Sequence, residues 1–473
     1  MPARTPIPEE VFYRVSGAPL VAGNRVRILK DGAENYAAWR EAIAAARRWI
    51  HFETFLIHDD EVGREFAGLL AAKARAGVTV RLLCDWLGSV RRTSRRFWRS
   101  LREAGVQIRF FNPPHFVSPF AWLSRDHRKM IGVDGEVAFV TGVCLGRMWL
   151  GDSRRGIDPW RDTGVELRGP AVAEVERAFA QVWAATGSAV PEQEIPQRSA
   201  IAPAGSTPVR VIATTPNTAG LYRLDHFIAA AAKHYLWLTD AYFVATTSYV
   251  QALSTAARDG VDVRLLAPGS SDIPAVAALS RAMYRPLLEA GVRVFEWNGS
   301  MLHAKTAVAD GYWARVGSTN LNLSSWLGNW ELDIVVEDEE FAHSMEQMYL
   351  EDLEHATEIV LTPRRRLLYM GPTRPLRRYG GRLAVGALGI GSAVGASIAN
   401  LRLLGPAEAR VMASAGLLLL ALSLLAVVWP WALTVPAAVL GVWIAVTLLA
   451  RAWQLHKKAG PPPDEHPGAS GTQ

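Results

Sequence analysis

The stretch HAKTAVADG, residues 303–311, decides the fold because an earlier stretch of the chain repeats its form. That earlier stretch is HRKMIGVDG, residues 127–135, and it places histidine, lysine, aspartate and glycine at the same spacing. In each copy the Asp-Gly pair stands between apolar runs, which is the strongest short-range signal for a β-hairpin. Two copies of one motif predict two copies of one structural unit.

Each motif carries a histidine and a lysine two positions apart: His127 with Lys129, and His303 with Lys305. Side chains alternate between the two faces of a strand, so each pair is expected to emerge on one face. Imidazole can act as a nucleophile or carry a proton near neutral pH, and an ammonium group attracts anionic oxygens. The pairs therefore favour chemistry on a phosphodiester.

Short polar residues follow the second hairpin in the sequence GSTN, residues 317–320, where Ser318 and Asn320 are candidate neutral donors to a phosphate. The first copy has TGVC, residues 141–144, at the same offset, so a thiol replaces the amide. We expect Cys144 to be a small buried side chain rather than a nucleophile.

Apolar periodicity predicts alternating strands and helices along both halves of the chain. In the first half the predicted elements are strands at 26–29, 50–57, 78–84 and 106–111, with helices at 36–46, after the caps Asp59 and Asp60, and at 97–104. The second half repeats the order, with a strand at 209–212, a helix at 225–233 and an apolar run at 236–244. The pattern predicts an α/β fold made of two tandem repeats, each a mixed sheet flanked by helices.

Changes in composition suggest where these units begin and end. We expect an N-terminal extension (1–25), a first repeat (26–190), a linker (191–207), a second repeat (208–361), a basic segment (362–382), a hydrophobic region (383–450) and a polar tail (451–473).

The formal net charge of +6 favours an acidic partner, either anionic lipid or nucleic acid. The chain has two cysteines, Cys84 and Cys144, which are too few for a disulfide framework and lack the spacing of zinc ligands. We therefore expect a reducing compartment and no structural metal. The first residues show no signal-peptide pattern.

Two runs without charged residues, 411–428 and 434–450, approach the ~20 residues that a bilayer-spanning helix needs. Basic residues precede the first run and follow the second, so the positive-inside rule predicts a membrane hairpin with both ends in the cytoplasm. Residues 383–401 are a weaker third candidate. The arginines at 364–382 also suit a surface of anionic headgroups.

At these residues the chain resembles the phospholipase D superfamily, and most closely the bacterial cardiolipin synthases, from about Val26 to about Leu361. Beside the paired motif, the likeness includes FETF and HDDEVG within residues 52–63, DWLGS at 85–89, WRDT at 160–163 and NWE at 329–331. The resemblance implies that the two repeats pack as a pseudo-dimer with both motifs at their shared interface.

The resemblance also implies roles for the site residues. His127 would be the nucleophile that forms a phosphohistidine, and His303 the acid that protonates the leaving alcohol and later the base. Lys129 and Lys305 would hold the non-bridging oxygens with help from Ser318 and Asn320, so no metal or cofactor is needed.

Four carboxylates complete this set. Asp134 and Asp310 close the two motifs and are grouped with the catalytic residues, although their place in Asp-Gly turns favours support of the site's fold. Asp162 and Glu331 look like the acidic partners that orient the two histidines.

The implied activity is that of a membrane-bound phosphatidyltransferase that makes cardiolipin from two phosphatidylglycerol molecules and releases glycerol. Two alternatives from the same superfamily stay open: a phospholipase D that hydrolyses phospholipid to phosphatidic acid, and a nuclease, which a membrane hairpin would serve poorly. The expected partners are phosphatidylglycerol and an anionic membrane surface, without nucleic acid, and the expected place is the cytoplasmic side of a bacterial inner membrane. The oligomeric state and the natural acceptor alcohol stay open.

Overall fold

The computed structural model describes residues 8–114, 124–361 and 367–370, together with single residues and short groups between Leu417 and Leu449. Contacts divide the chain into two compact units, and the larger one runs Met1–Pro113 and Leu123–Glu408. All strands, and all helices named below by a label, belong to the larger unit.

The first half of the chain forms one α/β repeat, as its periodicity predicts. Its elements are β1 (Val21–Lys30), α2 (Asp31–Ala45), β2 (Trp49–Thr54), α3 (Glu61–Arg75), β3 (Thr79–Asp85), α4 (Trp86–Ser89), α5 (Arg95–Glu103), β4 (Gln107–Phe111), β5 (Met130–Val133), β6 (Val137–Thr141), β7 (Thr163–Arg168) and α6 (Val172–Ala185). Asp60 caps α3 as predicted, because its side chain accepts the Gly63 N–H at 3.0 Å.

The second half repeats this order. Its elements are β8 (Thr207–Thr214), α7 (Gly220–Ala231), β9 (Tyr235–Thr239), α8 (Thr247–Arg258), β10 (Asp262–Pro268), α9 (Pro274–Glu289), β11 (Arg293–Trp297), β12 (Thr306–Ala309), β13 (Trp313–Gly317), β14 (Glu331–Glu337), α10 (Glu339–Glu354), β15 (Ala356–Leu361) and β16 (Leu367–Met370). A further helix, α1 (Glu9–Ser16), precedes β1 and packs its Phe12 into the core of this second repeat.

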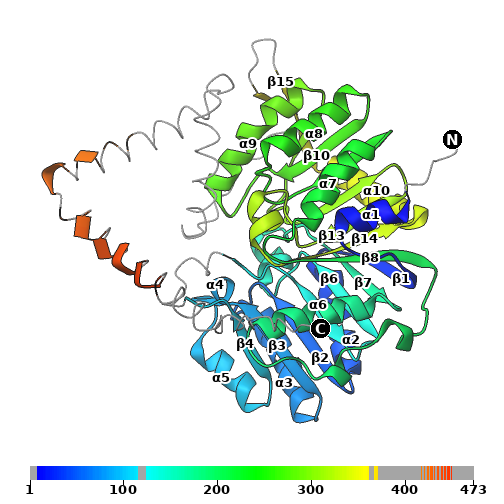
Figure 1. Ribbon diagram of the computed structural model, residues 1–473, viewed down its shortest axis with the longest axis vertical. Coiled ribbons are helices and arrows are strands. Elements are labelled where there is room, and N and C mark those ends of the chain that lie inside the picture. Colours follow the sequence, from blue (N-terminus) through cyan, green and yellow to red (C-terminus); the bar gives the residue numbers. More distant parts are fainter. Residues whose placement is uncertain are drawn as a thin grey trace, which may run out of the picture. The chain divides into compact units, whose positions relative to one another are not determined.

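The described strands form one continuous mixed sheet in the order β16-β15-β11-β10-β9-β12-β13-β14-β8-β1-β7-β6-β5-β2-β3-β4. Strands β2, β3 and β4 are parallel, and so are their counterparts β9, β10 and β11. The antiparallel pair β1 and β8 joins the two repeats, which lie side by side in Figure 1. The order of strands in one half is thus mirrored in the other.

One hydrophobic cluster contains side chains from both repeats and gives them a common core. Helices α6 and α10 contribute Phe179, Trp183, Phe341 and Met345 to it, and the strands of both halves contribute the rest. Each repeat also has a separate cluster on the other face of its sheet. The shared cluster fixes how the two repeats sit against each other within the larger unit, which agrees with the expected pseudo-dimer.

Both predicted hairpins are present, between β5 and β6 and between β12 and β13. Asp134 and Gly135 have φ values of 55° and 69°, and Asp310 and Gly311 have 49° and 68°. Positive φ at both central residues is the geometry that favours Asp-Gly in a two-residue turn. The histidine–lysine pairs lie just before β5 and β12 rather than inside these strands, which corrects their predicted placement by a few residues.

The two motif aspartates bind backbone groups at the hairpin end of each repeat. Asp134 accepts the backbone N–H groups of Arg47, Arg48 and Trp49, each at 2.8 Å. Asp310 accepts those of Lys233, His234 and Tyr235 at 2.8–3.0 Å. Each carboxylate thereby ties its hairpin to the start of β2 or β9, at the end of β5 or β12 opposite to the motif histidine. These contacts account for both aspartates as structural groups.

Replacing Asp134 by alanine is expected to lower the free energy of unfolding by about 3 kcal/mol, because three N–H groups lose a charged acceptor. Denaturant unfolding measures this loss, and Asp310→Ala should cause a similar one. The folded fraction of either variant should keep its specific activity within about twofold, since neither carboxylate contacts His127 or His303. A variant with unchanged stability and no activity would show that the aspartate is catalytic instead.

The predicted membrane region lies largely outside the described residues, including all of 383–401. Among the residues that the structure describes, no helix combines the length and the apolar character needed to cross a membrane. The described residues between Leu417 and Leu449 are mostly helical, and large apolar side chains there are exposed, with Val427 at 80% and Trp431 at 70%.

Candidate active site

Backbone hydrogen bonds between the two repeats bring the two motifs together. The N–H of His127 donates to the carbonyl of Trp330 at 2.9 Å, and the N–H of His303 donates to the carbonyl of Arg161 at 2.7 Å. Each motif histidine therefore lies beside the segment that carries the acidic residue of the other repeat. Neither repeat holds a complete site by itself.

Glu331 orients His127. The Nδ1 atom of His127 lies 2.9 Å and 3.1 Å from the two carboxylate oxygens of Glu331. The Ser318 hydroxyl donates to Glu331 at 2.6 Å and accepts the Leu332 N–H at 2.9 Å. This hydroxyl donates inside the protein, where Ser318 positions the carboxylate, and its contact with a phosphate stays a prediction.

Asp162 orients His303 in the same way, with Nδ1 of the imidazole 2.7 Å from Oδ2 of the carboxylate. The Trp149 indole N–H donates to the same oxygen at 2.9 Å and takes the part that Ser318 has beside Glu331. Gly142 occupies the position equivalent to Ser318, and a Cβ there would lie 2.0 Å from Asp162 Oδ1. Gly142 is thus required for the Asp162 carboxylate to approach, which explains why TGVC has glycine where GSTN has serine.

Both lysines are buried at the site. Lys129 and Lys305 each donate one hydrogen bond to the backbone carbonyl of the histidine two residues before it. An ammonium group has three donors, so both retain N–H groups for a bound anion. Asn320 is 3% exposed, and its Oδ1 has no hydrogen-bond partner among the described residues. Its role as a phosphate donor stays a prediction. Cys144 is buried in the core of the first repeat, as expected.

Burial and neighbouring charges set the protonation states. Burial lowers the pKa of His127, and burial with the Lys305 ammonium lowers the pKa of His303 to about 3. Burial alone would raise the pKa of Asp162, but the contact with His303 and the charge of Lys305 hold it at about 2. Burial lowers the pKa of Lys305 to about 8 against the attraction of Asp162. At neutral pH the site therefore has neutral imidazoles, charged Asp162 and Glu331 carboxylates and a charged Lys305.

Aromatic rings surround both imidazoles. Phe55 lies edge-on to His127 with ring centroids 5.2 Å apart. Trp160, Trp149 and Tyr242 lie 5.6, 5.7 and 5.9 Å from the His303 ring. These rings hold the imidazoles in place and exclude water from the side of each ring that they cover.

Two buried arginines, Arg128 and Arg161, stabilise the segments that carry the site residues, and neither was predicted from the sequence. Arg128, between His127 and Lys129 in the first motif, donates to the carbonyls of Glu331, Ala178 and Thr214 at 2.8–3.1 Å. Its contact with Glu331 connects the first motif to the acidic residue of the second repeat. The only signal in the sequence was that Arg128 replaces the alanine found at the matching position of the second motif.

Arg161 directly precedes Asp162 in the sequence. Its guanidinium pairs with Asp352 of α10 at 2.8 Å and with Asp31 at 3.1 Å. Asp31 also accepts the backbone N–H of Asp162 at 2.9 Å. These contacts tie the segment that carries Asp162 to both repeats.

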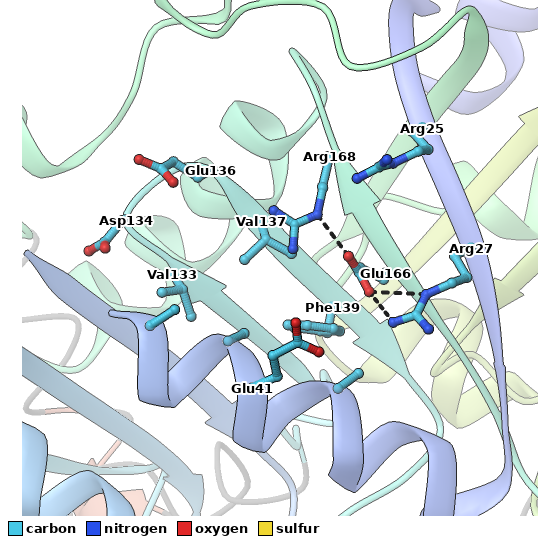
Figure 2. Close-up of a pocket in the computed structure, with 13 residues that line it drawn as sticks. Arg25, Arg27, Glu41, Val133, Asp134, Glu136, Val137, Phe139, Glu166 and Arg168 are labelled. Carbon is cyan, nitrogen blue, oxygen red and sulfur yellow. Dashed lines mark hydrogen bonds and ion pairs between the residues drawn. The ribbon is translucent and has the colours of Figure 1, made fainter. Parts of the chain in front are cut away.

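A separate pocket of about 490 Å³ lies at the hairpin end of the first repeat (Figure 2). Arg27 and Arg168 line it, and both pair with Glu166 at its centre. Asp134 is the one motif residue among its lining side chains, and its carboxylate holds backbone groups. This pocket is distinct from the site of the two histidines. Across the described part of the chain, no cluster of three or more His, Cys, Asp or Glu side chains could hold a metal ion.

Two histidine–lysine pairs that converge on one site, each histidine held by a carboxylate from the other repeat, define the class of protein: an enzyme of the phospholipase D superfamily. A family model described as "Cardiolipin synthase, PLD-like domain" matches residues 39–183 and 226–353. These two segments fall in the two repeats and together make up more than half of the chain.

Similarity to known proteins supports this family assignment. The chain is 34% identical to cardiolipin synthase A of Pseudomonas fluorescens over 371 residues, which are 77% of this chain and 75% of that protein. It is 33% identical to the cardiolipin synthase of Alkalihalophilus pseudofirmus over 354 residues, which are 73% and 69% of the two chains. The crystal structure of the phosphatidylserine synthase of Haemophilus influenzae has a TM-score of 0.59 at 16% identity, over 74% of this chain and 91% of that one, so it shows the shared fold.

The chain therefore belongs to the cardiolipin synthase family of the phospholipase D superfamily. It is a phosphatidyltransferase, as the sequence analysis expected.

Proposed function

We propose that the protein makes cardiolipin by transferring a phosphatidyl group from one phosphatidylglycerol molecule to another through a phosphohistidine intermediate. The observation that carries this proposal is the crossed arrangement of the site. Each histidine binds a carboxylate through Nδ1, so the Nε2 atoms of both rings are available for the substrate. Within the described residues, neither Nε2 has a hydrogen-bond partner in the protein.

In the first step the Nε2 lone pair of His127 attacks phosphorus, and the bond from phosphorus to the glycerol oxygen breaks. Glu331 stabilises the positive charge that develops on the imidazole. His303, protonated when the anionic substrate enters, gives its Nε2 proton to the leaving glycerol. Lys129 and Lys305 hold the two non-bridging oxygens.

In the second step the hydroxyl of a second phosphatidylglycerol gives its proton to Nε2 of His303 and attacks phosphorus. The bond from phosphorus to Nε2 of His127 breaks. His127 returns to its neutral imidazole form, and cardiolipin is released with the transferred phosphate as a diester. His127 is the better candidate for the nucleophile because its side chain is 12% exposed, against 7% for His303.

We place the reaction at the cytoplasmic face of a bacterial inner membrane. Exposed apolar side chains between Leu417 and Leu449 support membrane attachment, since apolar surface in water is unfavourable. The arginines at 364–382 favour an anionic lipid surface on that side. Protection of the catalytic repeats from protease in sealed inverted vesicles would contradict this orientation.

The direct test incubates the purified protein in detergent micelles with phosphatidylglycerol labelled in its glycerol headgroup. Cardiolipin together with free labelled glycerol would support the transferase. Phosphatidic acid in place of cardiolipin would mean that water is the acceptor and that the protein is a phospholipase D.

The pH dependence of the reaction should follow Lys305. Its pKa is lowered from 10.5 to about 8 by burial, so its charge is present below about pH 8 and is lost as the pH rises through that value. We expect kcat/KM to fall by about an additional tenfold per pH unit above pH 8 compared with below it, because this ratio reports ionisations of the free enzyme and Lys305 loses its charge there. Initial rates at low substrate from pH 6 to pH 10 measure this limb. A ratio that stays constant to pH 10 would contradict the role of Lys305.

A further inference from the structure

A polar pair beside His303 has no role in the steps described above. The hydroxyl of Tyr242 donates to Oδ1 of Asp272 at 2.8 Å. Tyr242 follows β9, and Asp272 lies in the loop between β10 and α9. Both come after the carboxyl ends of parallel strands, the edge at which α/β sheets bind their ligands.

Two contacts place this pair at the reaction centre. The Tyr242 ring lies edge-on to the His303 imidazole with centroids 5.9 Å apart. The Lys305 ammonium lies 5.9 Å from the centre of the same ring. Among the described residues, no basic side chain forms an ion pair with Asp272. Burial raises the pKa of Asp272, while Lys305 and Arg92 act against that rise.

The matching loop of the first repeat carries the opposite charge. After β3 and α4, Arg92 donates to Nε2 of His58 at 3.2 Å. Burial lowers the pKa of His58, and the Arg92 charge lowers it further, so this imidazole is a neutral acceptor that holds the guanidinium. The charge of Arg92 also reaches Asp272. The two repeats thus present an acid and a base from equivalent loops of one site.

From this geometry we infer that Asp272, held by Tyr242, binds the hydroxyl groups of the headgroup alcohol beside His303, and that Arg92 binds the phosphate of the acceptor lipid. The inference rests on the proposed function and adds the basis of acceptor choice. A carboxylate accepts hydrogen bonds from a polyol, and a guanidinium binds a phosphodiester. Water offers neither the second hydroxyl nor the phosphate, so the pair selects phosphatidylglycerol over water.

The test measures how the phosphohistidine is partitioned between acceptors. Wild type, Asp272→Ala, Tyr242→Phe and Arg92→Ala receive phosphatidylglycerol, and the ratio of cardiolipin to phosphatidic acid is recorded. A second series adds labelled free glycerol to cardiolipin and records labelled phosphatidylglycerol, which forms only from the added glycerol, against phosphatidic acid. The ratio is independent of how fast the intermediate forms, so a general loss of activity does not imitate the effect. Asp259→Asn, an exposed carboxylate at the end of α8, is the matched control.

Asp272→Ala is expected to lower both ratios at least tenfold, and Tyr242→Phe by a smaller factor in the same direction. Arg92→Ala should lower the cardiolipin ratio about tenfold and leave the free glycerol ratio unchanged, because free glycerol has no phosphate. Wild-type ratios in both Asp272→Ala and Tyr242→Phe would overturn the inference while the transferase stands. A wild-type enzyme that forms no cardiolipin would overturn the proposed function first and the inference with it.

Discussion

Replacing His127 by alanine is expected to abolish transfer, with a loss of roughly 10⁴-fold or more in kcat, because His127 is the proposed nucleophile that forms the covalent intermediate. The imidazole is held by Glu331 through Nδ1, and its removal leaves the lysines and His303 in place. The folded protein should therefore still bind phosphatidylglycerol. Mass spectrometry of digests prepared without acid should find a peptide phosphorylated at His127 in the wild type and none in the variant.

His303→Ala should be as inactive with phosphatidylglycerol, but for a different reason. Its loss removes the acid that protonates the leaving glycerol, a contribution of about 10²–10⁴-fold. A diester with a p-nitrophenyl leaving group needs no acid, so His303→Ala should still release one equivalent of p-nitrophenol in a burst. His127→Ala should release none. A burst from His127→Ala and none from His303→Ala would reverse the two roles.

Most of the fold could be predicted from residues that are close together in the sequence. The Asp-Gly turns predicted both hairpins because their positive φ values depend on neighbouring residues alone. The alternation of strands and helices followed from apolar periodicity in the same way. The pairing of histidine with lysine, and the burial of Cys144, could also be expected from positions close together in the chain.

Contacts between distant segments could not be predicted in this way. Nothing near Asp162 in the sequence shows that its partner is His303, 141 residues away. The indole of Trp149 replaces a hydroxyl only because Gly142 leaves room for the carboxylate, and that exchange depends on the packed structure. Ser318 was expected to bind phosphate, since the sequence alone does not show its contact with Glu331. That contact forms only when β13 and β14 pair.

A second large loss of activity is expected for Glu331→Gln, because each histidine is held by a carboxylate from the other repeat. The glutamine amide would donate to Nδ1 of His127 through its NH₂ group, so the ring proton would move to Nε2 and the nucleophilic lone pair would be lost. A wrong imidazole tautomer costs about 10⁴-fold in kcat where an acidic partner is replaced by its amide in a serine protease. We expect a loss of about 10³–10⁴-fold here, with unchanged unfolding, because the amide fits the same space. Glu358→Gln, at a partly exposed carboxylate paired with Arg293, is the matched control.

Asp162→Asn should separate the two carboxylates by function. This variant changes the tautomer of His303, so it should fail with phosphatidylglycerol yet keep the p-nitrophenol burst, which needs only the nucleophile. Glu331→Gln should lose the burst as well. Since each carboxylate belongs to the repeat opposite its histidine, this pattern would show that the covalent step depends on Glu331 from the second repeat, and proton transfer on Asp162 from the first. Equal bursts in both variants would mean that the carboxylates serve stability and do not set the tautomers.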